Sequence, residues 1–245
     1  MPLYGLIGYP LSHSFSGAYF TEKFRQLGLD DHRYELFPLS AIDEVRLLLQ
    51  RPGLKGLNVT IPYKQQVLAY LDDKSGIPVG LNACNCIHIR DGRTYGFNTD
   101  VTGFDISLSE HLLPVHNKAL ILGNGGATEA VKYVLKKKSI AFSVVSRVLR
   151  EGSHLTYNDL SPAVIASHRL IINTTPLGMY PDVGTCPRIP YEGIGPEHYL
   201  FDLTYNPEKT LFLQKGAERG ATIKNGADML VIQAEESWKI WNGTI

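Results

Sequence analysis

The sequence predicts an α/β protein of two domains, an N-terminal βαβ domain with a mixed, mainly parallel sheet and a second, Rossmann-like domain. Three observations carry this prediction. Short apolar strands alternate with helical stretches along most of the 245 residues. The alternation is interrupted by Asp-Gly at 91–92, which is a signal for a two-residue hairpin turn. It resumes at 118–138, where a strand, a glycine-rich turn and a helix follow one another. The main boundary is therefore expected near residue 102.

The first half of the chain reads as strands and helices in turn. The predicted segments, in chain order, are a strand over 3–9, a helix over 16–28 ended by Gly28, a strand over 33–39, a helix over 41–50, a strand over 54–60 and a helix from Pro62. Such βαβαβ order predicts parallel neighbours joined by crossover helices.

The start of the helix expected at Pro62 raises a question about Lys64. Proline suits the first helical position, so Lys64 would lie in the first turn. The positive end of a helix dipole disfavours an ammonium group there. This position would therefore help Lys64 to give up a proton, whereas the ordinary alternative is a solvent-facing helix lysine.

The hairpin brings polar residues together. In the segment CNCIHIRDGRTYGF (84–97), pairing outward from the turn at 91–92 places Asn85 opposite Asn98. Asp100 follows two residues beyond Asn98 and is expected to lie near Asn85.

A glycine-rich turn opens the second domain. The apolar run 119–122 leads directly into GNGGAT (123–128) and then a helical stretch. Glycines at such a turn let backbone N–H groups approach a pyrophosphate, although Thr128 replaces the third glycine of the usual fingerprint and a plain tight turn is the alternative. Further strands are predicted over 141–147, 168–175 and 199–205, with a final helix over 226–241.

The end of the second strand of this domain indicates the cofactor type. An acid there would bind the ribose 2′-hydroxyl of NAD, but no acid occurs before Glu151. Arg147 stands at that position instead, where a guanidinium can pair with a 2′-phosphate. A solvated loop arginine is the alternative; together with the missing acid, Arg147 favours NADP.

Composition narrows the class of protein. The chain has 24 basic residues (Lys and Arg) and 24 acidic residues (Asp and Glu), so its formal net charge is zero. This balance gives no reason to expect a nucleic acid or an anionic membrane as partner. The N-terminus lacks a signal-peptide pattern, and three cysteines fit a reducing cytoplasm. Cys84, Cys86 and His88 share a strand face but lack the further ligands that a zinc site needs, so no metal is expected.

Serines near the N-terminus form a further polar group. Ser12, Ser14 and Ser16 would share one face of an extended segment and could donate hydroxyls to an anion or polyol, although turns and caps are the commoner use of serine.

These segments together resemble the motifs of the shikimate dehydrogenase family (NADP-dependent shikimate 5-dehydrogenase). The matching segments, in family order, are GYPLSHSFS (8–16), GLNVTIPYK (56–64), NTD (98–100), GNGGA (123–127), NTTPLGM (173–179), FDLTYNPEKT (201–210) and GADMLVIQ (226–233). The match covers almost the whole chain.

The resemblance implies an oxidoreductase that reversibly reduces 3-dehydroshikimate to shikimate with NADPH, in the shikimate pathway of aromatic amino-acid biosynthesis. By position it implies Lys64 and Asp100 as the catalytic pair. It implies Ser14, Ser16, Thr60, Asn85, Tyr205 and Gln233 as substrate-binding residues. It implies Gly123, Gly125, Gly126, Ala127, Arg147, Thr174, Gly226 and Met229 as cofactor-binding residues.

The resemblance also implies an organisation. A substrate-binding domain over 1–101 is expected to be completed by the helix at 226–245, the NADP-binding domain to span 102–225, and the active site to lie in the cleft between them. The expected protein is cytoplasmic, a monomer or homodimer, with a small-molecule substrate. Alternatives are a quinate/shikimate dehydrogenase with relaxed substrate or NAD use, and a non-catalytic sensor on the same scaffold.

The sequence departs from the family pattern at several positions. Cys86 and Val101 replace the usual threonine and glycine, so the substrate pocket is expected to be slightly reshaped there. Ser146 and Val148 flank Arg147 where asparagine and threonine are usual, which removes phosphate contacts and leaves the strictness of the NADP preference open.

Overall fold

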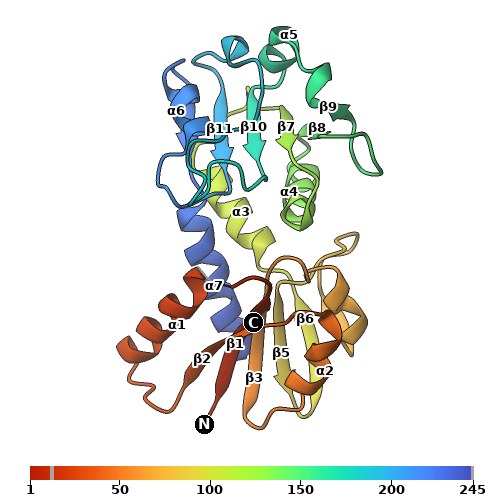
Figure 1. The fold of residues 1–245 in the computed structure, drawn as a ribbon, viewed down its shortest axis with the longest axis vertical. Coiled ribbons are helices and arrows are strands. Elements are labelled where there is room, and N and C mark those ends of the chain that lie inside the picture. The colour runs from red at the N-terminus through yellow and green to blue at the C-terminus, as the bar shows by residue number, and fades with distance from the viewer. Residues whose placement is uncertain (12–13, 244–245) are drawn as a thin grey trace. The chain divides into compact units, whose positions relative to one another are not determined.

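The computed structural model describes residues 1–11 and 14–243, so Ser12 lies outside the described residues. The chain divides into two compact units: unit 1 is residues 1–102 with 232–245, and unit 2 is residues 103–231. Figure 1 shows both units with most of their helices and strands labelled. The divisions fall inside two helices, α3 (Asp100–Ser109) and α7 (Ala227–Trp241).

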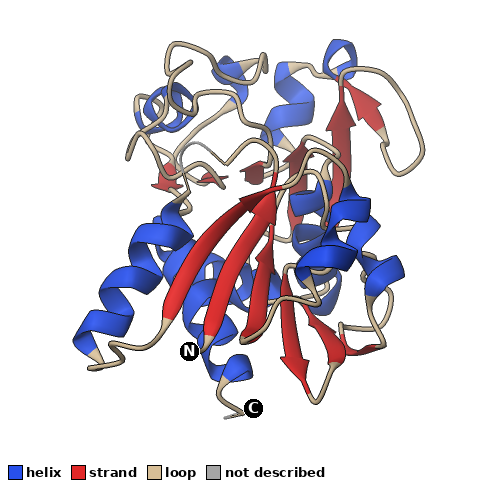
Figure 2. Cartoon of the chain, turned by 60° about the horizontal axis from the view of Figure 1, so that its bottom comes forward, coloured by secondary structure: helices blue, strands red, loops and turns tan. Residues whose placement is uncertain are grey.

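Unit 1 is built on a six-stranded mixed sheet in the order β2-β1-β3-β5-β6-β4, whose strands run side by side in Figure 2. The strands are β1 (Leu3–Gly8), β2 (Arg33–Pro38), β3 (Leu54–Val59), β4 (Asp73–Gly76), β5 (Cys86–Arg90) and β6 (Arg93–Phe97). The β1 strand pairs in parallel with β2 and β3, and β4 with β6, while β5 is antiparallel to both of its neighbours. The mixed, mainly parallel sheet is confirmed.

Two helices, α1 (Phe15–Gln26) and α7, meet in unit 1 and lie side by side in Figures 1 and 2. Lys23 of α1 forms an ion pair of 2.7 Å with Glu235 of α7. Large aromatic side chains pack both helices on the sheet: Tyr4, Phe20, Phe24 and Trp241 share one buried cluster. The Trp241 indole donates to the Ile87 carbonyl at 3.0 Å and lies where a side chain on Gly56 would collide with it.

The prediction of a helix that begins at Pro62 is wrong. Residues 61–65 form turns, and only a short 3-10 helix, η2 (Gln66–Tyr70), follows. The carbonyl groups that an α-helix would use are bonded elsewhere: the Ile61 carbonyl accepts from the Tyr9 N–H at 3.0 Å, and the Lys64 carbonyl accepts from the Cys84 N–H at 2.7 Å. Long-range backbone pairing therefore overrides the local helical preference, and Lys64 does not lie in the first turn of a helix. The predicted helix over 41–50 is likewise reduced to η1 (Ile42–Glu44) and α2 (Val45–Leu48).

The hairpin between β5 and β6 is confirmed in turn and register. Asp91 and Gly92 both have positive φ, 53° and 73°. These are the values that a two-residue turn matching the strand twist requires. His88 pairs with Tyr95 and Cys86 with Phe97, and the Asn85 N–H donates to the Phe97 carbonyl at 3.1 Å beyond the last paired residues.

Unit 2 carries a six-stranded, fully parallel sheet. Its strands are β7 (Lys118–Leu122), β8 (Ala141–Ser146), β9 (Leu155–Thr156), β10 (Leu170–Asn173), β11 (Tyr199–Asp202) and β12 (Thr222–Lys224). Its other elements, apart from parts of α3 and α7, are α4 (Gly126–Lys137), η3 (Tyr157–Asp159), α5 (Pro162–Ala166), η4 (Tyr191–Gly193) and α6 (Leu211–Ala217). Counted from β7, the spatial order is 3-2-1-4-5-6, which is the Rossmann order.

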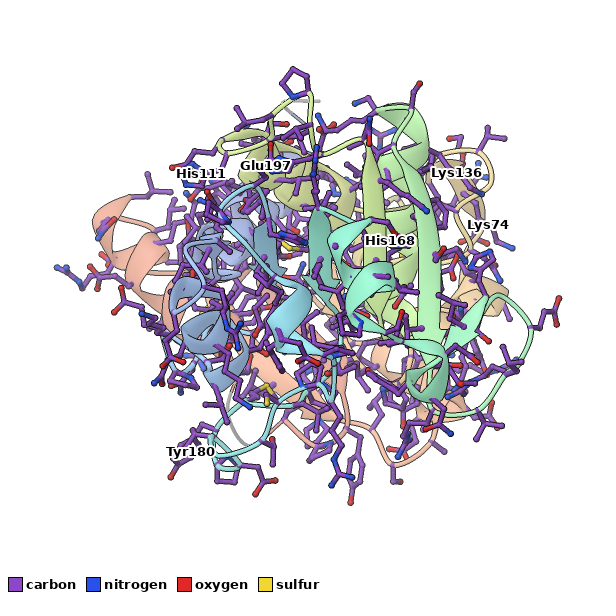
Figure 3. The ribbon with its side chains drawn as sticks, turned by 90° about the horizontal axis from the view of Figure 1, so that it is seen from above. Lys74, His111, Lys136, His168, Tyr180 and Glu197 are labelled. Carbon is purple, nitrogen blue, oxygen red and sulfur yellow. The ribbon has the colours of Figure 1, made fainter. Side chains whose placement is uncertain are left out.

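Both faces of this sheet are covered. Leu120 and Leu122 of β7 pack with Phe212 and Leu213 of α6 in one buried cluster, whereas Ala119 and Ile121 alternate to the opposite face. Buried strands of this kind read as continuous apolar runs, as β7 does. Figure 3 labels His168, which is buried two residues before β10, and Tyr180, which is 55% exposed in the loop after β10.

The α/β class with a mixed sheet and a Rossmann-like sheet is confirmed. Several short elements were not expected from the sequence: β4, α3, β9, α5, α6 and β12. Within the described residues, no helix has the length and apolar character needed to cross a membrane.

Candidate functional site

A close ion pair joins two of the predicted site residues. The Lys64 Nζ donates to Asp100 Oδ2 at 2.6 Å, and the two side chains are only 14% and 11% exposed. The pair joins the turn after β3 to the first residue of α3. Because water is largely excluded, the geometry of this charged hydrogen bond is well defined.

Of the two residues in this pair, Asp100 and not Lys64 lies at a helix N-terminus, that of α3. Asp100 is the acidic residue in the first turn of α3. A helix N-terminus stabilises a carboxylate. Lys64 itself lies in a turn outside any helix, so its expected position in a first helical turn is wrong, and the helix N-terminus carries Asp100 instead.

The three residues of the 98–100 segment each make a different contact in unit 1. The Asn98 side chain donates to the Ala83 carbonyl at 2.8 Å, and its oxygen accepts from the Val101 N–H at 3.3 Å, which fixes the start of α3. Thr99 bonds to Asn85, and Asp100 bonds to Lys64. Sequence reasoning expected Asp100 near Asn85 but assigned no part to Thr99.

Asn85 and Gln233 meet at Thr99. The Asn85 Oδ1 accepts from the Thr99 N–H at 2.6 Å, and its Nδ2 donates to Thr99 Oγ1 at 3.0 Å. The Thr99 hydroxyl is 3.5 Å from Gln233 Oε1 on α7. All three residues are buried. Residues far apart in sequence are thus gathered in unit 1.

The serine segment differs from expectation. Because α1 begins at Phe15, Ser14 stands at its N-cap position and Ser16 lies in its first turn, so the extended face predicted for these serines is wrong. The Ser14 hydroxyl is buried and has no hydrogen-bond partner among the described residues. An orphaned buried hydroxyl of this kind is costly unless a ligand satisfies it. Ser16 contacts Tyr34, whose pKa burial raises well above its ordinary value.

Thr60 follows the last residue of β3. Its N–H donates to the Ile7 carbonyl at 2.9 Å, and its methyl lies where a side chain on Gly8 would collide. Thr60 is therefore held at the carboxyl end of β1, four residues before Lys64.

The glycine loop of unit 2 has room for a ligand. Gly123 has a φ of 113°, and a Cβ there would come within 2.6 Å of Thr174 Oγ1. Gly125, in contrast, would meet nothing within 4 Å, so no protein contact explains its missing side chain. The first N–H groups of α4, which include those of Gly126 and Ala127, have no intrahelical acceptor. An open backbone beside a helix N-terminus suits a pyrophosphate.

Thr128 and Thr174 tie this loop to the neighbouring strand. Thr128, which is fully buried, accepts from the Gly125 N–H at 3.2 Å and lies 2.9 Å from the Thr174 hydroxyl. Thr174 directly follows β10, whose neighbours in the sheet include β7. Between these two strands the order of the sheet reverses, and ligands of open α/β sheets bind at such a switch point. Thr128 thus stabilises the turn in place of a third glycine.

Arg147 lies at the end of β8, one residue beyond its last member, and is exposed. The Asn124 side chain of the glycine loop donates to the Glu151 carbonyl at 3.0 Å, which links the loop after β8 to the glycine loop. Because Arg147 is exposed, its guanidinium can be reached by an anion from solvent.

A buried carboxylate that sequence reasoning missed organises the 201–210 segment. Asp202 accepts from Thr210 Oγ1 at 2.6 Å, from the Thr204 N–H at 3.0 Å and from Asn173 Nδ2 at 3.0 Å. Burial raises the pKa of Asp202 to about 6. The aspartate and threonine at the ends of the D-x-x-Y-x-P-x-x-T pattern were the available signal. The predicted substrate contact Tyr205 lies inside this segment.

The remaining predicted cofactor residues lie at the start of α7. Gly226 precedes the helix, and a Cβ there would come within 2.4 Å of the Leu203 carbonyl oxygen. Met229 is buried one turn later. The structure thus places them in unit 2, and their roles stay predictions. Within the described residues, no group of three or more His, Cys, Asp or Glu could hold a metal.

Known proteins with similar sequences and structures fit this arrangement. Residues 6–87 match the family model for the shikimate dehydrogenase substrate binding domain. The protein of Clostridium beijerinckii named shikimate dehydrogenase (NADP(+)) is 37% identical to this chain. The alignment, 257 residues long with its gaps, covers 98% of this chain and 92% of that protein.

Two solved structures resemble the whole chain. Shikimate 5-dehydrogenase of Thermus thermophilus, in complex with NADP(H) and shikimate, has a TM-score of 0.86 at 29% identity and covers 99% of this chain and 94% of that one. Quinate dehydrogenase of Corynebacterium glutamicum, in complex with NAD, has a TM-score of 0.85 at 27% identity with the same coverage, 99% and 94%. Sequence identity over nearly full length, together with the matched substrate-binding model, shows that the chain belongs to the shikimate dehydrogenase family.

Proposed function

We propose that this chain is an NADP-dependent shikimate dehydrogenase, which reversibly reduces 3-dehydroshikimate to shikimate in aromatic amino-acid biosynthesis. The observation that carries the proposal is the Lys64–Asp100 pair at 2.6 Å, largely shielded from water. Reduction of a ketone needs a proton on its oxygen as well as a hydride, so the reaction requires a positioned general acid. Lys64 supplies such an acid.

The proton moves through Lys64. Its Nζ carries three N–H donors, of which Asp100 accepts one. A second can donate to the ketone oxygen, and the proton passes to that oxygen as it gains negative charge. In the oxidation direction, the neutral amine takes the hydroxyl proton. Asp100 accepts the hydrogen bond from the amine and so orients it toward the substrate.

Unit 1 is proposed to bind the substrate. The orphaned Ser14 hydroxyl, with Ser16 close by in sequence, suits the substrate carboxylate. Thr60, Asn85 and Gln233 supply hydroxyl and amide groups for the ring hydroxyls. These groups come from the β3 end, the hairpin entrance and α7, and they lie in the same unit as Lys64.

Unit 2 is proposed to bind NADP. The open backbone at Gly125 and the α4 N-terminus fit a pyrophosphate, and Arg147 fits the 2′-phosphate. When bound, the reduced nicotinamide supplies the hydride. Thr174, Gly226 and Met229 are proposed to lie near the ribose or nicotinamide.

The test is turnover of the purified protein with shikimate and NADP, followed by the absorbance of NADPH. Lys64→Ala should lower kcat by about 10²- to 10⁴-fold, which is the range for loss of a general acid or base. Lys23→Ala is the matched control, because it removes a lysine from another ion pair of unit 1, with Glu235 at 2.7 Å. Wild-type turnover in Lys64→Ala would refute the assigned role.

A second candidate function is a quinate/shikimate dehydrogenase that also uses NAD. The similarity to the quinate dehydrogenase of Corynebacterium glutamicum favours it. Running the wild-type assay with shikimate and quinate against NADP and NAD separates the two functions. If the proposed function is correct, kcat/KM is highest with shikimate and NADP.

We further propose that the protein works in a reducing cytoplasm as a monomer or homodimer. The three free cysteines, Cys84, Cys86 and Cys186, support the reducing compartment. Light scattering of the purified protein measures the oligomeric state.

A further inference from the structure

A chain of hydrogen bonds runs through the interior of unit 1 beneath the proposed substrate residues. The Tyr34 hydroxyl donates to Asn58 Oδ1 at 2.8 Å, and Asn58 Nδ2 donates to Ser237 Oγ at 2.9 Å. Ser237 in turn donates to the backbone carbonyl of Gln233 at 2.9 Å and lies 3.3 Å from the Thr99 hydroxyl. Asn58, Thr99 and Ser237 are all buried. Strand β3, the start of α3 and helix α7 are thereby linked through side chains.

The donors and acceptors of this chain fix the orientation of the Asn85 amide. The Thr99 backbone N–H can only donate, so the Asn85 atom 2.6 Å from it must be the carbonyl oxygen. The other end of the amide is then Nδ2, which donates one N–H to Thr99 Oγ1 at 3.0 Å. Among the described residues the second N–H has no acceptor. Asn85 therefore presents a donor in one defined direction.

The Thr99 hydroxyl also reaches Gln233. Besides accepting from Asn85 Nδ2, the hydroxyl has three acceptors in reach for its own proton: Ser237 Oγ at 3.3 Å, Asn85 Oδ1 at 3.4 Å and Gln233 Oε1 at 3.5 Å. Thr99 is thus in contact with the side chains of both Asn85 and Gln233, which are proposed to bind ring hydroxyls. It is itself only 3% exposed.

We propose that Thr99 is a positioning residue for substrate recognition, which holds the Asn85 amide with its N–H directed to a ring hydroxyl and is itself held by Ser237. The inference rests on the proposed function, because it assumes that Asn85 binds the substrate. Thr99 acts through Asn85 and Gln233, so its loss should be felt in substrate binding more than in proton transfer. Ser237 and Asn58 act one step further from the substrate.

The test compares three substitutions in the full-length protein. Thr99→Val keeps the shape of the side chain and removes the hydroxyl; it should raise the KM for shikimate about five- to tenfold, the loss expected for one hydrogen bond. The KM for NADP should stay at the wild-type value. Thr99→Ser should restore shikimate KM, because it restores the hydroxyl. Thr94→Val is the matched control: Thr94 is a buried threonine of β6 whose hydroxyl bonds to Asp72, and its loss should leave shikimate KM unchanged.

A double-mutant cycle separates positioning from general damage. In the Asn85→Ala background, Thr99→Val should add less than about twofold to shikimate KM, because residues that act through one another are not additive. An undiminished effect in that background would overturn the proposal, as would an unchanged KM in Thr99→Val. If Thr99→Val does not fold, Ser237→Ala in the same cycle takes its place, with a smaller rise in KM expected.

The wild-type assay distinguishes the two failures. A wild-type protein that turns over shikimate while the Thr99 variants are indistinguishable from it overturns the positioning role alone. A wild-type protein that turns over neither shikimate nor quinate overturns the proposed function and this inference with it. A wild-type protein that turns over quinate but not shikimate overturns the proposed function in favour of the second candidate, and the same double-mutant cycle measured with quinate then decides the positioning role.

Discussion

Replacing Asp202 by asparagine should change how the stability of this protein depends on pH. The Asp202 carboxyl is fully buried at the end of β11 and accepts hydrogen bonds from Thr210, Thr204 and Asn173. Burial raises its pKa from 3.8 to about 6, although these hydrogen bonds oppose the shift. The folded protein therefore binds a proton at this site more tightly than the unfolded chain does.

The size of the effect follows from the shift. A rise from 3.8 to about 6 is roughly two pKa units. At about 1.4 kcal/mol per unit, this corresponds to on the order of 3 kcal/mol. Because the folded-state pKa is the higher one, the contribution to stability is fully present below pH 3.8 and is lost as pH rises through about 6. The asparagine side chain of the variant does not titrate, so the variant would lack this dependence.

Urea unfolding of wild type and Asp202→Asn, measured from about pH 3.5 to about pH 7.5, tests this reasoning. The wild-type free energy of unfolding minus that of the variant should fall by on the order of 3 kcal/mol across this range, whatever its value at the acid end. Asp72→Asn is the control of opposite sign, since hydrogen bonds from Thr94 lower the pKa of Asp72 and its contribution is lost as pH falls. A wild-type-minus-variant difference that is flat or rises with pH would refute the assignment.

Two further predictions concern the cofactor and the helix that completes unit 1. Arg147→Ala should raise the KM for NADP by about tenfold or more while leaving the kinetics with NAD unchanged, because the guanidinium is proposed to pair with the 2′-phosphate alone; an equal effect on both cofactors would contradict this. Trp241→Ala should lower the free energy of unfolding by about 3–5 kcal/mol, because it removes a buried aromatic side chain above Gly56. Trp241→Phe should cost less, about 1–3 kcal/mol, because it keeps an aromatic ring but loses the indole N–H that bonds the Ile87 carbonyl and the pyrrole-ring atoms that lie over Gly56. Equal losses in the two variants would refute the packing argument.

Elements governed by local chemistry could be predicted from the sequence. The Asp-Gly pair at 91–92 requires positive φ values that few other residue pairs tolerate, so both the turn and the pairing of β5 with β6 followed from it. The strand–glycine–helix start at 118–138 and the final helix were predictable for the same reason, because turn chemistry and hydrophobic periodicity act over a few residues.

The segment around Pro62 shows where local reasoning fails. Its composition favours a helix, but Tyr9 and Cys84, which are distant in sequence, bond to the carbonyl groups of Ile61 and Lys64. Local propensity contributes only a fraction of a kcal/mol per residue, so long-range backbone hydrogen bonds readily outweigh it. The same limit explains why α3, which begins at Asp100, was not expected.

For the candidate site, the sequence by itself determined the chemical groups and their spacing: Lys64, Asp100, Asn85 and the glycine turn are distinctive in type, spacing or motif. Only the tertiary structure decided what each of them touches. Thr99 has no distinctive local pattern, yet sheet pairing and the docking of α7 bring it between the amides of Asn85 and Gln233. Local sequence encodes backbone preferences over a few residues, whereas contacts between segments more than a hundred residues apart exist only once the sheet and helices of unit 1 have packed.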